Sequence, residues 1–416
     1  MLQQPAFGRR LRKLRQARGL SQTALAGDGM STGYLSRLES GARQPTDRAV
    51  AYLAGQLGLE AADFEEPAGG SLAHALTLVA STGSDAAMET LREALAAEGH
   101  ETPVLRWQAL WQLAQQRRVQ GDHIGERDYL EELVRLGDAV GLVALRVRGL
   151  TRLARCLRSL GEINAALDAA MTAHHLARED DLEVEDRAAV LLALVSVEAE
   201  AGRMPDARAH TDELVELVAG RSDALWAEAM WTAAAVRLRQ GDHTAAQGYL
   251  EEALEKFGSG EDLLLWLRLR LAAGRLHLQK LPPDPEAAER CVMAAEPALA
   301  FVDTLSLRQE LTALKADLAF LTARYDDARV LLGELAEVEP RMTYRDRVRL
   351  DILRHQLRIR SGDDSGVQGL RALAEQAQSD ANIDLAAEIW RILAESLAQS
   401  AVERGSAASG VSASGV

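Results

Sequence analysis

The sequence predicts an all-α protein made of two parts, four short helices at the N-terminus followed by a long array of repeated helix pairs. Apolar residues recur at spacings of three and four through both parts, and the alternation typical of strands is almost absent. From residue 72 onward, turns recur about 40 residues apart, most of them marked by glycine. The charge also changes sign: residues 1–59 carry nine basic and three acidic side chains, a net +6 within a chain of −15, which leaves −21 for the rest.

Turn and cap residues place the four N-terminal helices. They are expected over residues 7–18, 22–26 and 32–40 and over a stretch that opens at Pro45 and Thr46. Gly19 ends the first helix and Gly41 ends the third. Ser21 and Ser31 stand where an N-cap accepts a hydrogen bond from the helix that follows. Between the second and third helices, residues 27–29 read Gly-Asp-Gly and predict a turn.

Two short helices joined by a glycine-containing turn suggest a helix-turn-helix. Leu20-Ser21-Gln22, Leu25-Ala26 and the run from Tyr34 to Gly41 follow one another as in the phage-repressor-type (Xre) DNA-binding family, which residues 1–59 resemble. The resemblance implies a lambda-repressor-like domain whose third helix enters the DNA major groove. The run from Ala26 to Tyr34 is one residue shorter than in the family pattern, so we expect a tighter or shorter turn.

The same resemblance assigns the DNA contacts. They are Gln22, Ser31, Thr32, Gly33, Tyr34, Ser36, Arg37 and Arg43. It also implies a structural pair between Arg15 and Glu39. A packing role is the alternative for Tyr34, and plain surface is the alternative for Gln22 and Arg37. A basic head on an acidic body fits a domain that contacts phosphates and a body that does not.

The rest of the chain repeats itself. Residues 60–71 predict a linker, 72–402 a helical repeat domain and 403–416 a disordered tail. Within the repeats, Gln120-Gly121-Asp122-His123 recurs 120 residues later as Gln240-Gly241-Asp242-His243. About eight such pairs resemble tetratricopeptide (TPR) repeats, which implies a right-handed solenoid with its first helices lining a concave surface. An irregular helical bundle is the alternative.

Motifs for catalysis or metal binding are missing from the sequence, so we expect no enzyme, cofactor or metal site. His174 and His175 are interpreted as surface residues, His123 and His243 as turn packing, and the two cysteines, Cys156 and Cys291, as buried small residues. Two cysteines and no apolar leader or membrane span favour the cytoplasm.

The first helices of the repeats hold candidate ligand residues. These are Trp107, Trp111, Arg148, Arg152, Arg155 and Trp231. The three arginines follow at i, i+4 and i+7 and so share one helix face. A concave, partly apolar groove with an arginine stripe suits a peptide or an acidic small molecule. The alternative is structural, since such tryptophans pack between repeats and such arginines pair with nearby acids.

A helix-turn-helix head on a TPR body resembles the RRNPP-type peptide-responsive regulators. The resemblance implies a cytoplasmic homodimer that binds operator double-stranded DNA, with a signalling peptide or small ligand in its repeats, as in quorum sensing. Those receptors hold peptides with asparagines, and this chain has only Asn164 and Asn382. The alternative is a DNA-tethered scaffold with a protein partner in the groove. A third hypothesis, an enzyme with a helix-turn-helix appendage, finds no clustered acid, base or nucleophile.

Overall fold

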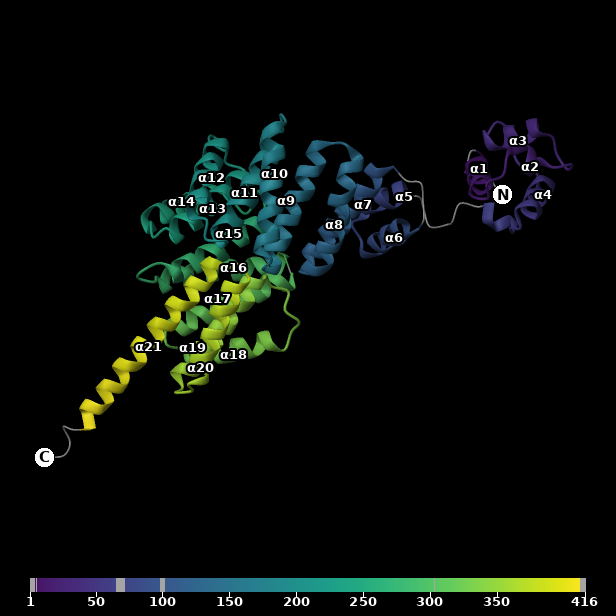
Figure 1. Ribbon diagram of the computed structural model, residues 1–416. Helices are drawn as coiled ribbons and strands as arrows, with labels where there is room; N and C mark the ends of the chain where they lie inside the picture. The colour runs from purple at the N-terminus through teal and green to yellow at the C-terminus, as the bar shows by residue number, and fades with distance from the viewer. Residues whose placement is uncertain (1–3, 5, 65–71, 98–101, 303, 412–416) are drawn as a thin grey trace. The chain divides into compact units, whose positions relative to one another are not determined.

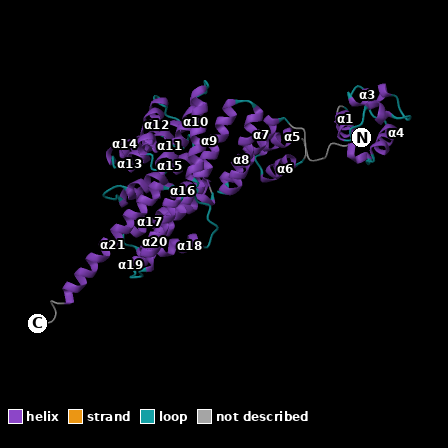
Figure 2. Cartoon of the chain, in the orientation of Figure 1, coloured by secondary structure: helices purple, strands orange, loops and turns teal. Residues whose placement is uncertain are grey.

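The protein is described by a computed structural model that covers residues 4, 6–64, 72–97, 102–302 and 304–411. Over these ranges every regular element is a helix and no strand occurs (Figure 2). The predicted all-α fold class is therefore confirmed. The chain divides into two compact units, residues 1–109 and 110–416.

The N-terminal domain consists of four α-helices and a short 3₁₀ helix (Figure 1). They are α1 (Ala6–Ala17), α2 (Gln22–Ala26), α3 (Thr32–Glu39), α4 (Asp47–Leu57) and η1 (Ala61–Phe64). Ser21, Ser31 and Thr46 cap α2, α3 and α4, each side chain accepting a hydrogen bond from a backbone N–H two or three residues into the helix. Such a cap stabilises by about 1 kcal/mol. The helices predicted from the sequence are confirmed: α2 has the predicted bounds, and the ends predicted for the other helices differ by one or two residues.

The core of this domain extends past residue 59, where the linker was expected to begin. Phe64 on η1 is buried, and its ring centre lies 5.5 Å from that of Phe7 on α1. Leu11, Leu35 and Leu53 complete the same buried cluster. Aromatic burial of this size stabilises a small domain, so residues up to Phe64 belong to it. The remainder of the expected linker, residues 65–71, lies outside the described residues.

Eight helix pairs follow, which agrees with the predicted number of repeats. The first helices are α5 (Leu72–Thr82), α7 (Pro103–Val119), α9 (Val143–Leu160), α11 (Val184–Glu200), α13 (Ala224–Arg239), α15 (Leu263–Gln279), α17 (Leu305–Leu321) and α19 (Tyr344–Arg360). The second helices are α6 (Asp85–Ala96), α8 (His123–Val140), α10 (Ile163–Glu179), α12 (Met204–Leu217), α14 (His243–Lys256), α16 (Pro285–Val302), α18 (Tyr325–Ala336) and α20 (Ser365–Ser379). A single helix, α21 (Ile383–Val411), ends the array.

The repeated Gly-Asp-His motif builds the turn between the two helices of a pair. Gly121 and Gly241 adopt φ of 71° and 79°, which glycine reaches without strain. The following aspartates, Asp122 and Asp242, cap the second helices by accepting hydrogen bonds from the backbone. The alanine five places after the turn glycine is buried, as at Ala246, so the two helices can cross closely.

The solenoid closes on itself through a contact that we call the seam. In the seam, the starts of α19 and α21 meet the glycine turns of earlier repeats. Asn382 is buried and donates a hydrogen bond to the carbonyl of Gly161, 221 residues away, over 3.1 Å. A side-chain carbon at Gly161 would lie 2.6 Å from the Tyr344 ring, and one at Gly202 would lie 2.9 Å from Ile383. Glycine at these two positions therefore allows both the turn between the paired helices and the close packing of the starts of α19 and α21.

The tail differs from the sequence prediction. α21 remains helical through Val411, although disorder was expected from residue 403, and residues 412–416 lie outside the described part. Alanine-rich sequence without proline supports this continuation. Among the described helices, none is both long and apolar enough to cross a membrane.

Candidate functional site

The exposed face of α3 carries the residues assigned to base contacts. Thr32, Gly33, Ser36 and Arg37 are exposed, whereas Leu35 on the opposite face is fully buried. Ser31, the N-cap, and Arg43, just after α3, are also exposed. The amphipathic spacing thus fixes the helix to the core and leaves its polar face open to a duplex.

An ion pair fixes α3 to α1. Arg15 donates two hydrogen bonds to Glu39, Nε to Oε1 over 2.6 Å and Nη2 to Oε2 over 3.0 Å. This confirms the predicted structural pair. Gln22, at the start of α2, donates from Nε2 to Glu39 Oε2 over 2.7 Å. Its side chain is half-buried, so Gln22 orients the two helices besides any contact with DNA.

Tyr52 on α4 holds the turn between α2 and α3. Its hydroxyl donates to the carbonyl of Ala26 over 2.9 Å and accepts from the backbone N–H of Gly29 over 3.0 Å. A side-chain carbon at Gly29 would lie 2.1 Å from the Tyr52 ring, so glycine is required there. The sequence analysis missed this role of Tyr52.

Tyr34 combines the two roles that the sequence left open. The side chain is half-buried and packs against the core of the domain. Arg43 lies over its ring, with the guanidinium carbon 4.9 Å from the ring centre, a distance at which a cation is attracted by the π-face. The tyrosine therefore also holds an exposed arginine beside the open face of α3.

A groove with a volume of about 730 Å³ runs along the inside of the solenoid. Most of its lining residues come from the first helices of the pairs, from α7 to α19, and from the terminal helix α21, as expected of a concave TPR surface. The groove is strongly charged. Its arginines are Arg118, Arg152, Arg155, Arg158, Arg239, Arg268, Arg275, Arg345, Arg349 and Arg391, and its carboxylates are Glu126, Glu200, Glu228, Glu310, Asp346, Asp384 and Glu388.

Three of the six predicted ligand residues line this groove, namely Arg152, Arg155 and Trp231. Trp107, Trp111 and Arg148 do not. Trp107 is buried, and Trp111 packs under the guanidinium of Arg152, 5.2 Å from the ring centre. Arg148 is paired with Asp186 through two hydrogen bonds of 2.7 and 3.0 Å, so the structural alternative holds for that arginine.

The histidines and cysteines occupy structural positions. His123 and His243 follow the turns as predicted, and both also line the groove. Cys156 is buried, its thiol donates to the carbonyl of His123 over 3.2 Å, and burial raises its pKa. Cys291 is half-buried and its pKa is also raised by burial, which keeps both thiols protonated and unreactive.

At the seam the charges of the groove are paired. Arg345 donates to Asp384 over 2.5 Å and lies 3.5 Å from Glu388 and 3.7 Å from Glu200. Arg239 donates to the same Asp384 over 3.0 Å. Burial opposes the charge of Asp384, but the two arginines outweigh it and lower its pKa to about 2. The seam is therefore a neutralised ion network, in which Glu200 is buried and the other groups are half-buried.

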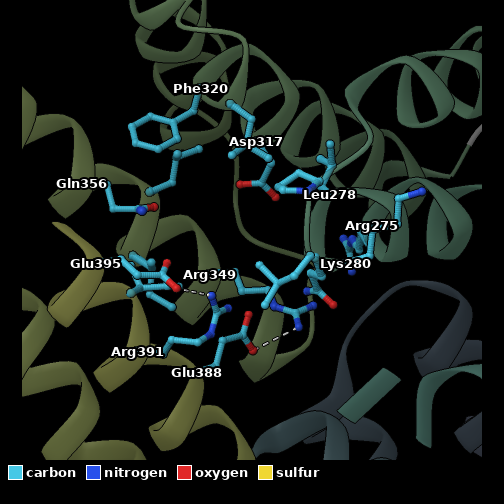
Figure 3. A pocket seen from close by; sticks show the side chains of 17 residues that line it. Arg275, Leu278, Lys280, Asp317, Phe320, Arg349, Gln356, Glu388, Arg391 and Glu395 are labelled. Atoms are coloured by element: carbon cyan, nitrogen blue, oxygen red, sulfur yellow. Dashed lines mark hydrogen bonds and ion pairs between the residues drawn. The ribbon is translucent and has the colours of Figure 1, made fainter. Parts of the chain in front are cut away.

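A smaller pocket of about 200 Å³ adjoins the groove where α15, α17, α19 and α21 meet (Figure 3). Arg349 is paired with Glu388 over 3.3 Å, and Arg391 with Glu395 over 2.8 Å. Asp317 makes no hydrogen bond or ion pair within the described part of the chain, and burial raises its pKa to about 6. Together with the apolar side chain of Phe320, these groups make an end wall that is half charged and half apolar.

Many groove residues share a repeat register, and of those that follow the sequence analysis had found only Arg155. Positions three and six before a turn glycine line the groove in successive repeats: Arg118, Arg155, Arg158, Ser196, Ala199, Ala235 and Leu238. This register was readable from the repeated glycines. The residues from α19 and α21 had no such signal, because they reach the groove only through closure of the solenoid.

The comparisons with known proteins agree with both parts of this description. Residues 6–66 match a family of helix-turn-helix domains, so the N-terminal domain is a helix-turn-helix domain. The match covers less than half of the chain. No curated protein sequence matches this chain.

Solved structures share the fold of nearly the whole chain. A Rap protein complexed with competence and sporulation factor aligns with a TM-score of 0.53 at 13% identity, over 95% of this chain and 99% of that one. The Rap conjugation gene regulator of plasmid pLS20, in complex with the Phr* peptide, gives 0.52 at 12% identity, over 90% and 96%. PlcR of Bacillus thuringiensis, solved with the peptide PapR7 and DNA, gives 0.41 at 14% identity, over 73% and 98%. The chain thus joins a helix-turn-helix domain to a TPR-type α-solenoid.

Proposed function

We propose that this protein is a sequence-specific transcription regulator whose solenoid binds a signalling peptide or small ligand and thereby controls DNA binding. The observation that carries the proposal is the combination of an open polar face on α3 with a charged groove of about 730 Å³ in the same chain. A groove of this volume is within the range of small-molecule and peptide-segment sites.

The head supplies the DNA contacts. Arg37 and Ser36 project from the exposed face of α3, and Thr32 lies at its N-terminal end, where helix-turn-helix proteins contact base edges. Arg43, just after α3, is proposed to contact the DNA backbone. We propose a homodimer that reads two half-sites about 34 Å apart, because paired heads gain both affinity and specificity.

The solenoid supplies the control. Two proteins that share its fold have been solved with a bound factor or peptide, which supports a ligand of that kind here. A ligand in the groove would favour one curvature of the repeats over another and so shift the population of states that fit the operator. A stoichiometric folded protein that co-purifies, with no effect of small ligands on DNA binding, would instead favour the scaffold alternative.

The test is selection of genomic DNA fragments by the full chain, followed by footprinting of the selected site. Arg37→Ala should lower affinity for that site by roughly tenfold or more, as for loss of a base contact. Arg48→Ala is the matched control, because Arg48 is an exposed arginine of the same domain on α4, outside the proposed interface. Equal affinity of the two variants would refute the assignment of α3.

A further inference from the structure

Three arginines of the groove stand apart from the rest, and we call them the arginine triad: Arg118 on α7, Arg155 on α9 and Arg268 on α15. The seven other groove arginines each have a carboxylate oxygen at 2.5–3.3 Å. Within the described residues, the triad has no carboxylate inside the 4.0 Å limit of an ion pair. Its one polar contact there is a long hydrogen bond of 3.4 Å from Arg155 to the carbonyl of Ala189.

The triad concentrates positive charge. Burial lowers the pKa of Arg155 and of Arg268, and the charge of Arg118 lowers both further. All three arginines line the same groove, although they come from three helices. Half-buried cations without a partner are unfavourable, so the free protein keeps them at a cost in stability. Such an arrangement is explained when a ligand supplies the missing anion.

We propose that the arginine triad binds a carboxylate of the ligand that occupies the groove. Guanidinium groups donate pairs of parallel hydrogen bonds to carboxylates, so groove arginines without an internal partner can receive a carboxylate of the ligand. The proposal rests on the proposed function, since it assigns a site to that ligand.

Nearby acids select a carboxylate over a phosphate dianion. Glu228 on α13 acts on both Arg155 and Arg268, and Glu310 on α17 acts on Arg268, each favouring the charged arginine. Arg158 also acts on Arg155, and Asp262 also acts on Arg268. The four arginines and three carboxylates together leave a small positive excess, which a single negative charge neutralises. A dianion would be repelled more strongly by both glutamates.

The binding test uses two degenerate heptapeptide libraries without Asp or Glu, one with free C-terminal carboxylates and one with C-terminal amides. Full-length protein is incubated with each, and retained peptides are identified by mass spectrometry. The free-acid library should be retained roughly tenfold or more over the amide library. Arg155→Gln combined with Arg268→Gln should abolish that preference. Equal retention of the libraries, or retention of neither, overturns the proposal, as does displacement by inorganic phosphate at lower concentration than by acetate.

The control is Arg135→Gln combined with Arg329→Gln, which removes two exposed arginines from the second helices α8 and α18. This variant should keep the preference for free acids. Thermal unfolding without ligand distinguishes a ligand-binding role of the triad from a stabilising role. The triad variant should have a higher melting temperature than the control, because it has lost unpaired, half-buried charge. A lower midpoint would mean that the triad stabilises the free protein, which overturns the proposal.

The two proposals fail separately. A chain that selects operator DNA but shows no preference for free acids refutes the carboxylate site alone. A chain that prefers free acids but selects no DNA keeps the site and refutes the regulator.

Discussion

The seam and the arginine triad occupy the same groove and use the same side chain in opposite ways. At the seam, Arg345 meets carboxylates from α11 and α21 and is neutralised within the protein. At the triad, Arg155 and Arg268 are half-buried with no carboxylate in ion-pair range among the described residues. The difference teaches that arginine in a concave surface does not by itself mark a ligand site. An arginine without an internal partner is available to a ligand, whereas a neutralised arginine is not.

Among the substitutions considered, removing Arg345 should cause the largest loss of stability. Arg345→Met would leave buried Glu200 and half-buried Asp384 and Glu388 with one fewer partner, and breaking such a network costs up to about 3–5 kcal/mol. Urea denaturation followed by circular dichroism measures the loss, with Arg329→Gln as an exposed control. A loss below about 1 kcal/mol would show that the seam contributes little.

Removing the charge of Asp317 should change stability with the opposite sign, because Asp317 is a half-buried carboxylate without an ion-pair partner in the described chain. Its pKa is raised from 3.8 to about 6, so between these values the folded state holds a proton that the unfolded state has released. Stability therefore falls as pH rises through this window, by no more than about 3 kcal/mol. Asp317→Asn should be more stable than wild type at pH 8 and equal at pH 4, measured by thermal unfolding. A destabilised variant at pH 8 would contradict this.

The contribution of Asp384 to stability should depend on pH in the opposite direction to that of Asp317. Its pKa is lowered from 3.8 to about 2, so its contribution to stability is present above pH 4 and is lost as pH falls toward 2. Asp384→Asn should cost about 2 kcal/mol at pH 7 and almost nothing near pH 2. Denaturant titrations at the two pH values test this, and a cost that does not change with pH would show that hydrogen bonding, not charge, holds the seam.

The smallest effect is expected for Arg391, whose partner Glu395 is close but exposed. The two side chains are 45% and 52% exposed and their atoms lie 2.8 Å apart. Solvent screens such a pair, so Arg391→Ala should change stability by less than about 1 kcal/mol. A larger loss of stability in denaturant unfolding would show that an ion pair stabilises this protein even where both side chains are exposed.

Much of the fold was predictable because its determinants are local. The Ser21 and Ser31 caps and the turn glycines are read from neighbouring residues, and all form as expected. The Asp122 and Asp242 caps belong to the same repeated motif, although the sequence analysis did not assign them. The Arg15–Glu39 pair followed from a family resemblance. The placement of Tyr52 against Gly29, and of Asn382 against Gly161, depends on approaches between distant segments that periodicity does not record.

The residues of the candidate groove were predicted only in part, because spacing along the chain does not record contacts between distant helices. Arg152 and Arg155 were found from their spacing along one helix face, and so was Arg148, which lies on that face but pairs with Asp186. Spacing identifies a face and does not identify its neighbours. The partners of Arg148 and Arg345 come from other helices, so only the folded structure separates a neutralised arginine from an available one.

The hydrogen bond between Asn382 and Gly161 has a consequence for how this chain can change over generations. Open repeat arrays gain or lose units readily, because each unit touches only its neighbours. Here the last repeats dock on the third and fourth pairs, so duplication or deletion of one intervening pair would move the docking residues out of register. We expect relatives that keep this asparagine and these turn glycines to keep the same number of repeats between them, and drift in repeat number to be confined to the segments outside that interval.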